Sequence, residues 1–242
     1  MEDLTITGMV LKSIKYKEKD MLIHIFSLEL GNITAIMRGV SSAKSKLKFA
    51  TQPFCFAKFD ITQSHDFYIV KSVELIDSFF DITSDYDNYV YASSMLEVCD
   101  YILKPNIIAE SLFLNLLKTI QNILYKDIDV SVAIIKFYLE LLQNLGYALN
   151  FNRCDNCGMK FVGDIKFNYE TGTFRCSSCS GGSRVEARDF TILKIITATE
   201  IDRLNTIKLN PAFCKVPLKI ILKNLQDRIN YRIKSFDVEK LI

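Results

Sequence analysis

Residues 154–179 read CDNCGMKFVGDIKFNYETGTFRCSSC, and this stretch sets the local fold of the C-terminal half. Its cysteines follow the pattern C-x2-C-x18-C-x2-C, a spacing at which four thiolates can surround one tetrahedral zinc ion. Between the pairs, apolar residues alternate with polar ones before a turn at residues 170–173, which predicts a β-hairpin. The stretch therefore predicts a zinc ribbon that holds one Zn²⁺ through Cys154, Cys157, Cys176 and Cys179.

The four-cysteine site is expected to be structural, because four protein ligands leave no position for a substrate or an activated water. Redox chemistry of the CxxC pairs stays open as an alternative. Disulfide bonds are less favoured, because seven cysteines are an odd number and the chain opens without the basic start of a secretory leader. The other three cysteines, Cys55, Cys99 and Cys214, have apolar neighbours and are expected in the core.

Length and hydropathy favour two domains without a membrane span. The chain has 242 residues, of which 49% are hydrophobic, but no run approaches eighteen uninterrupted apolar residues. The pattern changes from short strands to helices near residues 77–84, which predicts domains at 1–77 and 78–242. We expect a protein of the cytoplasm, associated with the nucleoid.

The first 77 residues predict five short strands with turns between them, at residues 6–16, 21–28, 32–40, 54–62 and 67–76. A long connection, residues 41–52, separates the third strand from the fourth and is polar and basic. Five strands with one elaborated loop are typical of an OB-fold, a small barrel that often binds single-stranded nucleic acid. The chain is therefore predicted to be an α+β protein with an N-terminal OB-fold barrel.

Helical periodicity begins after Asp77. Thr83, Ser84 and Asp85 are candidate caps for a first helix that ends near Leu103. Further helices are predicted at residues 109–125, 130–145, 188–199 and 215–231. The second domain is thus predicted to be α-helical, with the zinc ribbon inserted at residues 154–183.

Charge is distributed unevenly, although the formal net charge is only +2. Between Glu29 and Asp60 there are five basic residues and no acidic one. Local positive potential of this kind can hold a polyanion. The predicted phosphate contacts are Arg38, Lys44, Lys46 and Lys48.

Sequence motifs for catalysis are missing. The chain has neither a G-x-x-x-x-G-K-[ST] phosphate loop nor a G-x-G-x-x-G turn, and its two histidines neighbour no nucleophile motif. These observations favour a binding protein over an enzyme.

The order of a basic barrel, a helical domain and an inserted ribbon resembles the bacterial recombination mediator family RecO. Local strings are also similar to the family, at residues 8–11, 18–22, 26–31, 37–47, 145–154 and 232–235. The chain departs from the family pattern at Ser41 and Ser42, where relatives often carry basic residues, and this departure weakens the expected phosphate contacts.

The resemblance implies a non-enzymatic protein that binds single- and double-stranded DNA and anneals complementary strands. It also implies cooperation with RecR in loading RecA onto DNA covered by single-strand-binding protein (SSB), and capture of the SSB C-terminal tail by the helical domain. Lys215, Lys219 and Lys223 recur every four residues beside an apolar stripe, so they are candidates for receiving that acidic tail. The alternative is a transcription or translation factor that binds RNA through its OB-fold and zinc ribbon.

Overall fold

The computed structural model describes residues 3–64, 67–126 and 128–235. The chain divides into two compact units, Met1–Leu114 and Asn115–Ile242. The first unit therefore includes a helix that follows the barrel, beyond the predicted barrel domain of residues 1–77. The predicted boundary after residue 77 marks the change from strands to helices. Its role as a domain boundary stays a prediction.

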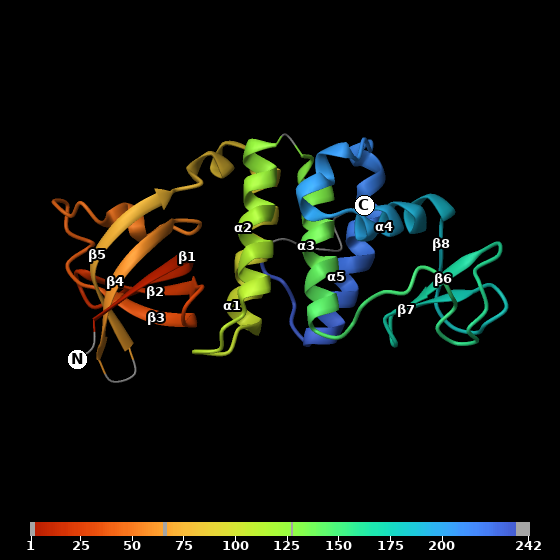
Figure 1. The fold of residues 1–242 in the computed structure, drawn as a ribbon, viewed down its shortest axis with the longest axis horizontal. Coiled ribbons are helices and arrows are strands. Elements are labelled where there is room, and N and C mark those ends of the chain that lie inside the picture. Colours follow the sequence, from red (N-terminus) through yellow and green to blue (C-terminus); the bar gives the residue numbers. More distant parts are fainter. Residues whose placement is uncertain (1–2, 65–66, 127, 236–242) are drawn as a thin grey trace. The chain divides into compact units, whose positions relative to one another are not determined.

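The first unit is built on a closed five-stranded barrel, which confirms the predicted OB-fold (Figure 1). The barrel order is β1-β2-β3-β5-β4, and β3 pairs with β5 in parallel while the other pairs are antiparallel. The alternating sequence pattern places one face of each strand in the barrel core, where residues such as Ile23, Ile25 and Phe59 have no exposed surface. The strands are β1 (Asp3–Tyr16), β2 (Asp20–Ser27), β3 (Gly31–Met37), β4 (Phe56–Ser64) and β5 (Phe67–Asp77).

The connection between β3 and β4 is a series of turns that contains the 3-10 helix η1 (Lys48–Thr51). Ala50 and Thr51 are buried, and Ala50 belongs to the barrel core. The C-terminal end of this basic loop is therefore anchored, while its lysines lie on the surface.

Helix α1 (Tyr86–Ile102) follows the short 3-10 helix η2 (Phe80–Ser84) and packs against β1. Its N-cap is Asp85, whose carboxylate accepts a hydrogen bond from the backbone N–H of Asn88 at 2.8 Å, as the sequence predicts. The carboxylate of Asp100 accepts from Lys12 Nζ at 3.0 Å and lies 2.5 Å from His24 Nδ1. Charged groups thus join α1 to β1 and β2.

The second unit is helical, as predicted. Helix α3 is buried along most of its length and packs against α4 and α5, because apolar side chains occupy more than one face of its sequence. The helices that follow α1 are α2 (Glu110–Tyr125), α3 (Val130–Asn144), α4 (Ala187–Ala198) and α5 (Lys215–Ile229), with the 3-10 helices η3 (Ile201–Thr206) and η4 (Pro211–Cys214) before α5. None of the helices in the described part of the chain is long and apolar enough to span a membrane.

The ribbon lies between α3 and α4 in the sequence and forms a small sheet of its own (Figure 1). Its predicted hairpin is present as β6 (Ile165–Asn168) and β7 (Thr173–Cys176). A third strand, β8 (Ser183–Val185), pairs with the other edge of β6. The sequence interpretation missed β8, because three residues are too few to show an alternating pattern.

Candidate metal centre and basic surfaces

The four predicted metal ligands lie together at one end of the ribbon. Their four Sγ atoms are within 4.8 Å of one another. The Sγ atoms of Cys154 and Cys179 are 3.7 Å apart, and so are those of Cys157 and Cys176. A tetrahedron with Zn–S bonds of about 2.3 Å has S–S edges of about 3.8 Å. The sulfur positions therefore fit one tetrahedral Zn²⁺, which they would hold as a structural cross-link between the two ends of the ribbon.

Hydrogen bonds to backbone carbonyls shape both CxxC turns. Gly158 donates its N–H to the Cys154 carbonyl at 2.8 Å, and Cys154 donates to the Met159 carbonyl at 2.8 Å. Gly158 has a φ of +74°, a conformation that side chains with a Cβ rarely adopt. At the second turn, Lys166 Nζ donates to the carbonyls of Ser177 and Cys179, at 2.9 and 3.0 Å. The sulfurs thus converge because the main chain on each side is fixed.

Two thiols of the centre, those of Cys154 and Cys157, have altered pKa values. Burial opposes ionisation of Cys154, but hydrogen bonds from the backbone of Cys176, Cys157 and Asn156 outweigh it and lower its pKa to about 6. A backbone hydrogen bond from Met159 favours the Cys157 thiolate, yet bonds to the neighbouring cysteine side chains hold its proton and raise its pKa to about 12. Hydrogen bonds within the cluster therefore favour ionisation of Cys154 and oppose ionisation of Cys157.

Aromatic packing connects the metal centre to α4. Phe161 packs against the cysteine cluster, and its ring centroid lies 5.3 Å from that of Phe190 on α4. Phe190 also contacts Phe174 on β7, with centroids 4.9 Å apart. The ribbon turn is held by α5, where Arg228 donates to the carbonyls of Tyr169 and Glu170 at 2.8 and 2.6 Å. The ribbon is therefore an integrated part of the second unit.

The remaining cysteines are buried, and none of the seven forms a disulfide bond. Burial raises the pKa of Cys55 and of Cys214 to about 12, and raises that of Cys99 as well. These three residues are core residues, as the sequence predicts.

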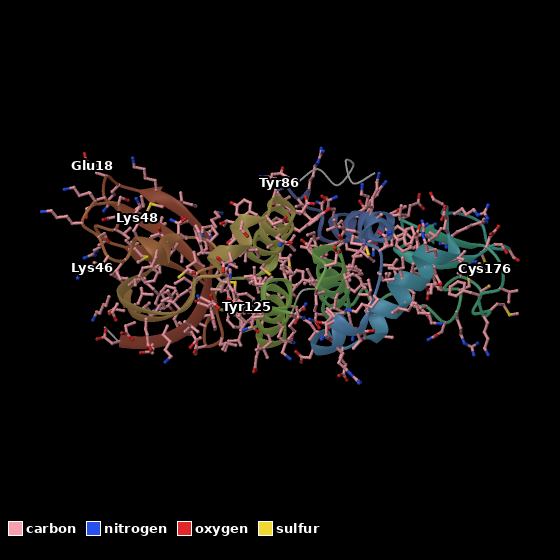
Figure 2. The ribbon with its side chains drawn as sticks, turned by 90° about the horizontal axis from the view of Figure 1, so that it is seen from above. Glu18, Lys46, Lys48, Tyr86, Tyr125 and Cys176 are labelled. Atoms are coloured by element: carbon pink, nitrogen blue, oxygen red, sulfur yellow. The ribbon has the colours of Figure 1, made fainter. Side chains whose placement is uncertain are left out.

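The predicted phosphate contacts lie in the connection between β3 and β4. Arg38, Lys44, Lys46 and Lys48 are all exposed, and none forms an ion pair with any residue in the described ranges. Figure 2 labels Lys46 and Lys48 of this connection. The fifth cation of the acid-free segment, Lys58, differs because it pairs with Glu74 at 3.6 Å. One surface loop thus carries four cations that have no ion-pair partner among the described residues.

The lysines of α5 have a different environment. Lys215 is exposed, whereas Lys219 and Lys223 are half-buried, and Lys223 Nζ lies 4.7 Å from the ring centroid of Tyr169. The apolar stripe beside them is core, because Leu218, Leu222 and Leu225 are at most 1% exposed. These three leucines therefore offer no apolar groove, and the role of the lysines in binding an acidic tail stays a prediction.

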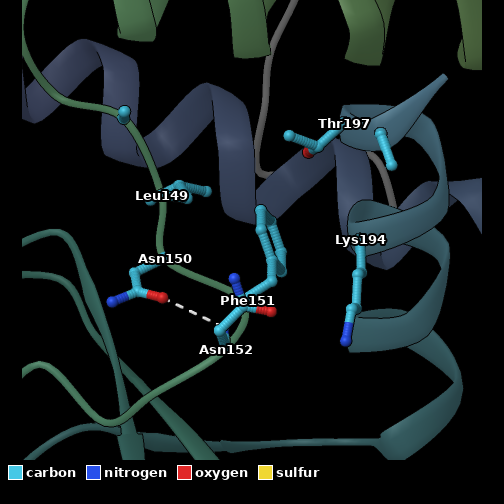
Figure 3. A pocket seen from close by; sticks show the side chains of 8 residues that line it. Leu149, Asn150, Phe151, Asn152, Lys194 and Thr197 are labelled. Carbon is cyan, nitrogen blue, oxygen red and sulfur yellow. Dashed lines mark hydrogen bonds between the residues drawn. The ribbon is translucent and has the colours of Figure 1, made fainter. Parts of the chain in front are cut away.

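A cavity that the sequence interpretation missed lies beside α4. It has a volume of about 410 Å³ and is lined by residues 148–152 together with Lys194, Thr197 and Ala198 (Figure 3). A neighbouring hollow of about 560 Å³ shares Lys194 and adds Arg153 and Lys160. Arg153 and Lys160 lie at the start of the ribbon and Lys194 lies on α4, so no run or period in the sequence could have indicated this surface.

Comparisons with known proteins agree with this architecture. The family model described as recombination protein O N terminal matches residues 1–79, and the model for recombination protein O C terminal matches residues 83–236. The protein named DNA repair protein RecO of Clostridium acetobutylicum is 30% identical over 237 residues, which are 97% of this chain and 96% of that protein. The protein of the same name from Clostridium novyi is 26% identical over 235 residues, covering 96% and 91% of the two chains. Because the two family models cover the barrel and the helical part with its cysteine ribbon, the chain belongs to the recombination protein O family.

Proposed function

We propose that this protein binds DNA without catalysing a reaction, anneals complementary single strands and, with RecR, helps to load RecA onto SSB-coated DNA. The observation that carries the proposal is the set of four exposed cations, Arg38, Lys44, Lys46 and Lys48, on one loop of an OB-fold barrel. The names of the relatives, which are called DNA repair proteins, support a role in repair.

Annealing is a task for which neutralisation of charge is sufficient. Two DNA strands repel each other through their phosphates, and a protein that contacts both backbones reduces that repulsion. The loop cations have no acidic partners among the described residues, so their charge is available to phosphate. A ribbon cross-linked by Zn²⁺ would contribute stability to the second unit and no chemical step.

Annealing of two complementary oligonucleotides, one carrying a quenched dye, tests this function. We expect wild-type protein to accelerate annealing of DNA, and the Lys44→Ala/Lys46→Ala/Lys48→Ala variant to accelerate it much less. Matched RNA strands are the control for the alternative function. Faster annealing or tighter binding of RNA than of DNA would favour an RNA-binding factor instead.

The SSB tail is the proposed ligand of the helical unit. An acidic tail needs cations and an apolar contact. Lys215, Lys219 and Lys223 offer cations, whereas the cavity beside α4 joins Lys194 to the apolar side chains of Leu149 and Phe151. Titration of a fluorescent tail peptide compares Lys219→Glu/Lys223→Glu with Lys194→Glu. Loss of affinity in Lys219→Glu/Lys223→Glu alone supports the lysines of α5 as the binding site for the tail. Loss in Lys194→Glu alone supports the cavity beside α4 as the binding site instead.

A further inference from the structure

An apolar pocket lies in the first unit, directly after the basic loop. Its volume is about 430 Å³, which is within the range of small-molecule binding sites. It is formed where η1, the end of β5, η2 and the start of α1 meet. We call it the aromatic pocket, and the lining residues that matter here are Phe49, Gln52, Phe54, Phe79, Phe80 and Tyr89.

Several rings of the aromatic pocket are exposed. Phe80 is 71% exposed, Tyr89 is 42% and Phe49 is 36%. Phe54 is buried in the pocket wall, and its ring centroid lies 6.2 Å from that of Tyr89. Exposure of three aromatic side chains around one cavity is unfavourable in water and is typical of a surface that binds a ligand.

The walls of the aromatic pocket include two residues with unusual backbone conformations. Phe54 has a φ of +72° and Phe79 a φ of +46°, values that bulky side chains rarely adopt. The Phe54 N–H donates to the carbonyl of Val10 at 3.0 Å, which holds the first in place. The Phe79 N–H donates to Asp77 Oδ1 at 2.9 Å, which holds the second. Conformations of this kind collect at ligand sites, where the surrounding structure enforces them.

Polar and charged groups are arranged unequally around the aromatic pocket. No charged residue of the described chain lines it, but the polar residues Gln52, Ser78 and Thr83 do. On one side, Lys48 immediately precedes Phe49 on η1. On the other side, η2 and the α1 N-cap carry Asp81 and Asp85. Charge would therefore favour a ligand whose apolar, hydrogen-bonding part fills the pocket and whose anionic part lies toward Lys48.

We propose that the aromatic pocket holds an unpaired base of a DNA single strand, whose phosphates lie on Lys46 and Lys48. A base offers a flat π-face to the aromatic rings and hydrogen-bonding edges to the Gln52 amide. Its phosphate carries the anionic charge that the basic loop complements. The proposal rests on the proposed function. It adds a contact to a DNA base, whereas the lysines of the basic loop contact only the phosphate backbone of the strand.

An abasic strand separates contacts to bases from contacts to phosphates. Binding of a thymidine oligonucleotide and of an abasic oligonucleotide with the same number of phosphates is measured by fluorescence anisotropy. The variant is Phe80→Ala, since removing a side chain that is 71% exposed leaves the core intact. The control is Tyr86→Ala, which removes an aromatic side chain that is 79% exposed and does not line the pocket.

We expect Phe80→Ala to weaken binding of the thymidine strand about tenfold, the lower part of the range for loss of one base stack. The abasic strand should bind equally to the wild type and to Phe80→Ala, and Tyr86→Ala should behave as wild type with both strands. Lys46→Ala/Lys48→Ala should weaken both strands, because both carry phosphates. A 2-aminopurine base in the strand should lose fluorescence on binding to the wild type but not to Phe80→Ala.

Two results would overturn the base-binding role. The first is equal affinity of the wild type and Phe80→Ala for the thymidine strand. In that case the pocket would instead be a binding site for an apolar segment of a protein partner. The second is an equal loss in Phe80→Ala and Tyr86→Ala. Failure of the wild type to bind either strand is a different result, because it refutes the proposed function itself.

Discussion

Replacing Lys44, Lys46 and Lys48 by alanine should change the salt dependence of single-strand binding by a predictable amount. Removal of one phosphate contact reduces the slope of log K against log salt by about 0.7. Removal of three contacts therefore reduces this slope by about 2. In 0.1 M salt, a slope change of this size corresponds to an affinity about 100-fold lower. The full effect is expected because all three side chains are exposed and have no acidic partner in the described part of the chain.

The matched control for this variant is Lys58→Ala. Lys58 belongs to the same acid-free segment, but it pairs with Glu74 at 3.6 Å, so much of its charge is compensated. Anisotropy titrations with a mixed-sequence strand at four salt concentrations, repeated with a homopolymer, measure both slopes. Phosphate contacts do not read bases, so both strands should weaken alike. A triple variant with the wild-type slope would refute the assignment and make the loop a solvated lysine surface.

Further predictions concern the metal and the charged contact between barrel and helix. The purified protein should contain one zinc per chain, as measured by metal analysis. Cys176→Ser should lose the zinc and unfold the ribbon, which limited proteolysis of residues 154–183 would detect. A metal-free protein with an intact ribbon would contradict this prediction. Asp100→Asn should lower the free energy of unfolding, measured by denaturant titration, by about 2 kcal/mol, because Lys12 and His24 lose their anionic partner. The control is Lys71→Ala, which removes an exposed ion pair and should have a clearly smaller effect. Burial opposes ionisation of Asp100, but hydrogen bonds from His24 and Lys12 outweigh burial and lower its pKa in the folded state. The ionised carboxylate therefore contributes its full stabilisation above about pH 4, and this stabilisation is lost as the pH falls through the folded-state pKa. An unchanged difference between wild type and Asp100→Asn at low pH would show that the carboxylate charge is not responsible.

Features with a strong local signal could be predicted from the sequence. The cysteine spacing indicated the four sulfurs that cluster, because two short turns and one hairpin determine their positions. Asp85, one of three neighbouring candidates in the sequence, caps the start of α1 for a similarly local reason. Helix positions followed from periodicity, since each helix buries one stripe or more.

Features assembled from distant segments could not be predicted. The contact of Asp100 with His24 joins residues 76 positions apart, and nothing near either residue indicates it. Lys223 has the spacing of a surface lysine, yet it lies over Tyr169 of the ribbon. The aromatic pocket likewise joins residues 49–55 to residues 75–89, and its exposed Phe80 would be assigned to a core by composition alone.

The attachment of α1 to the barrel determines which fragment of this protein can be studied alone. A fragment that ends at residue 77 would leave Lys12 and His24 without Asp100. It would also expose Phe26 and Phe56, whose rings contact Phe113 at centroid distances of 5.2 and 6.1 Å. A fragment that ends at Leu114 keeps these partners, and should be the more soluble of the two when each is produced separately.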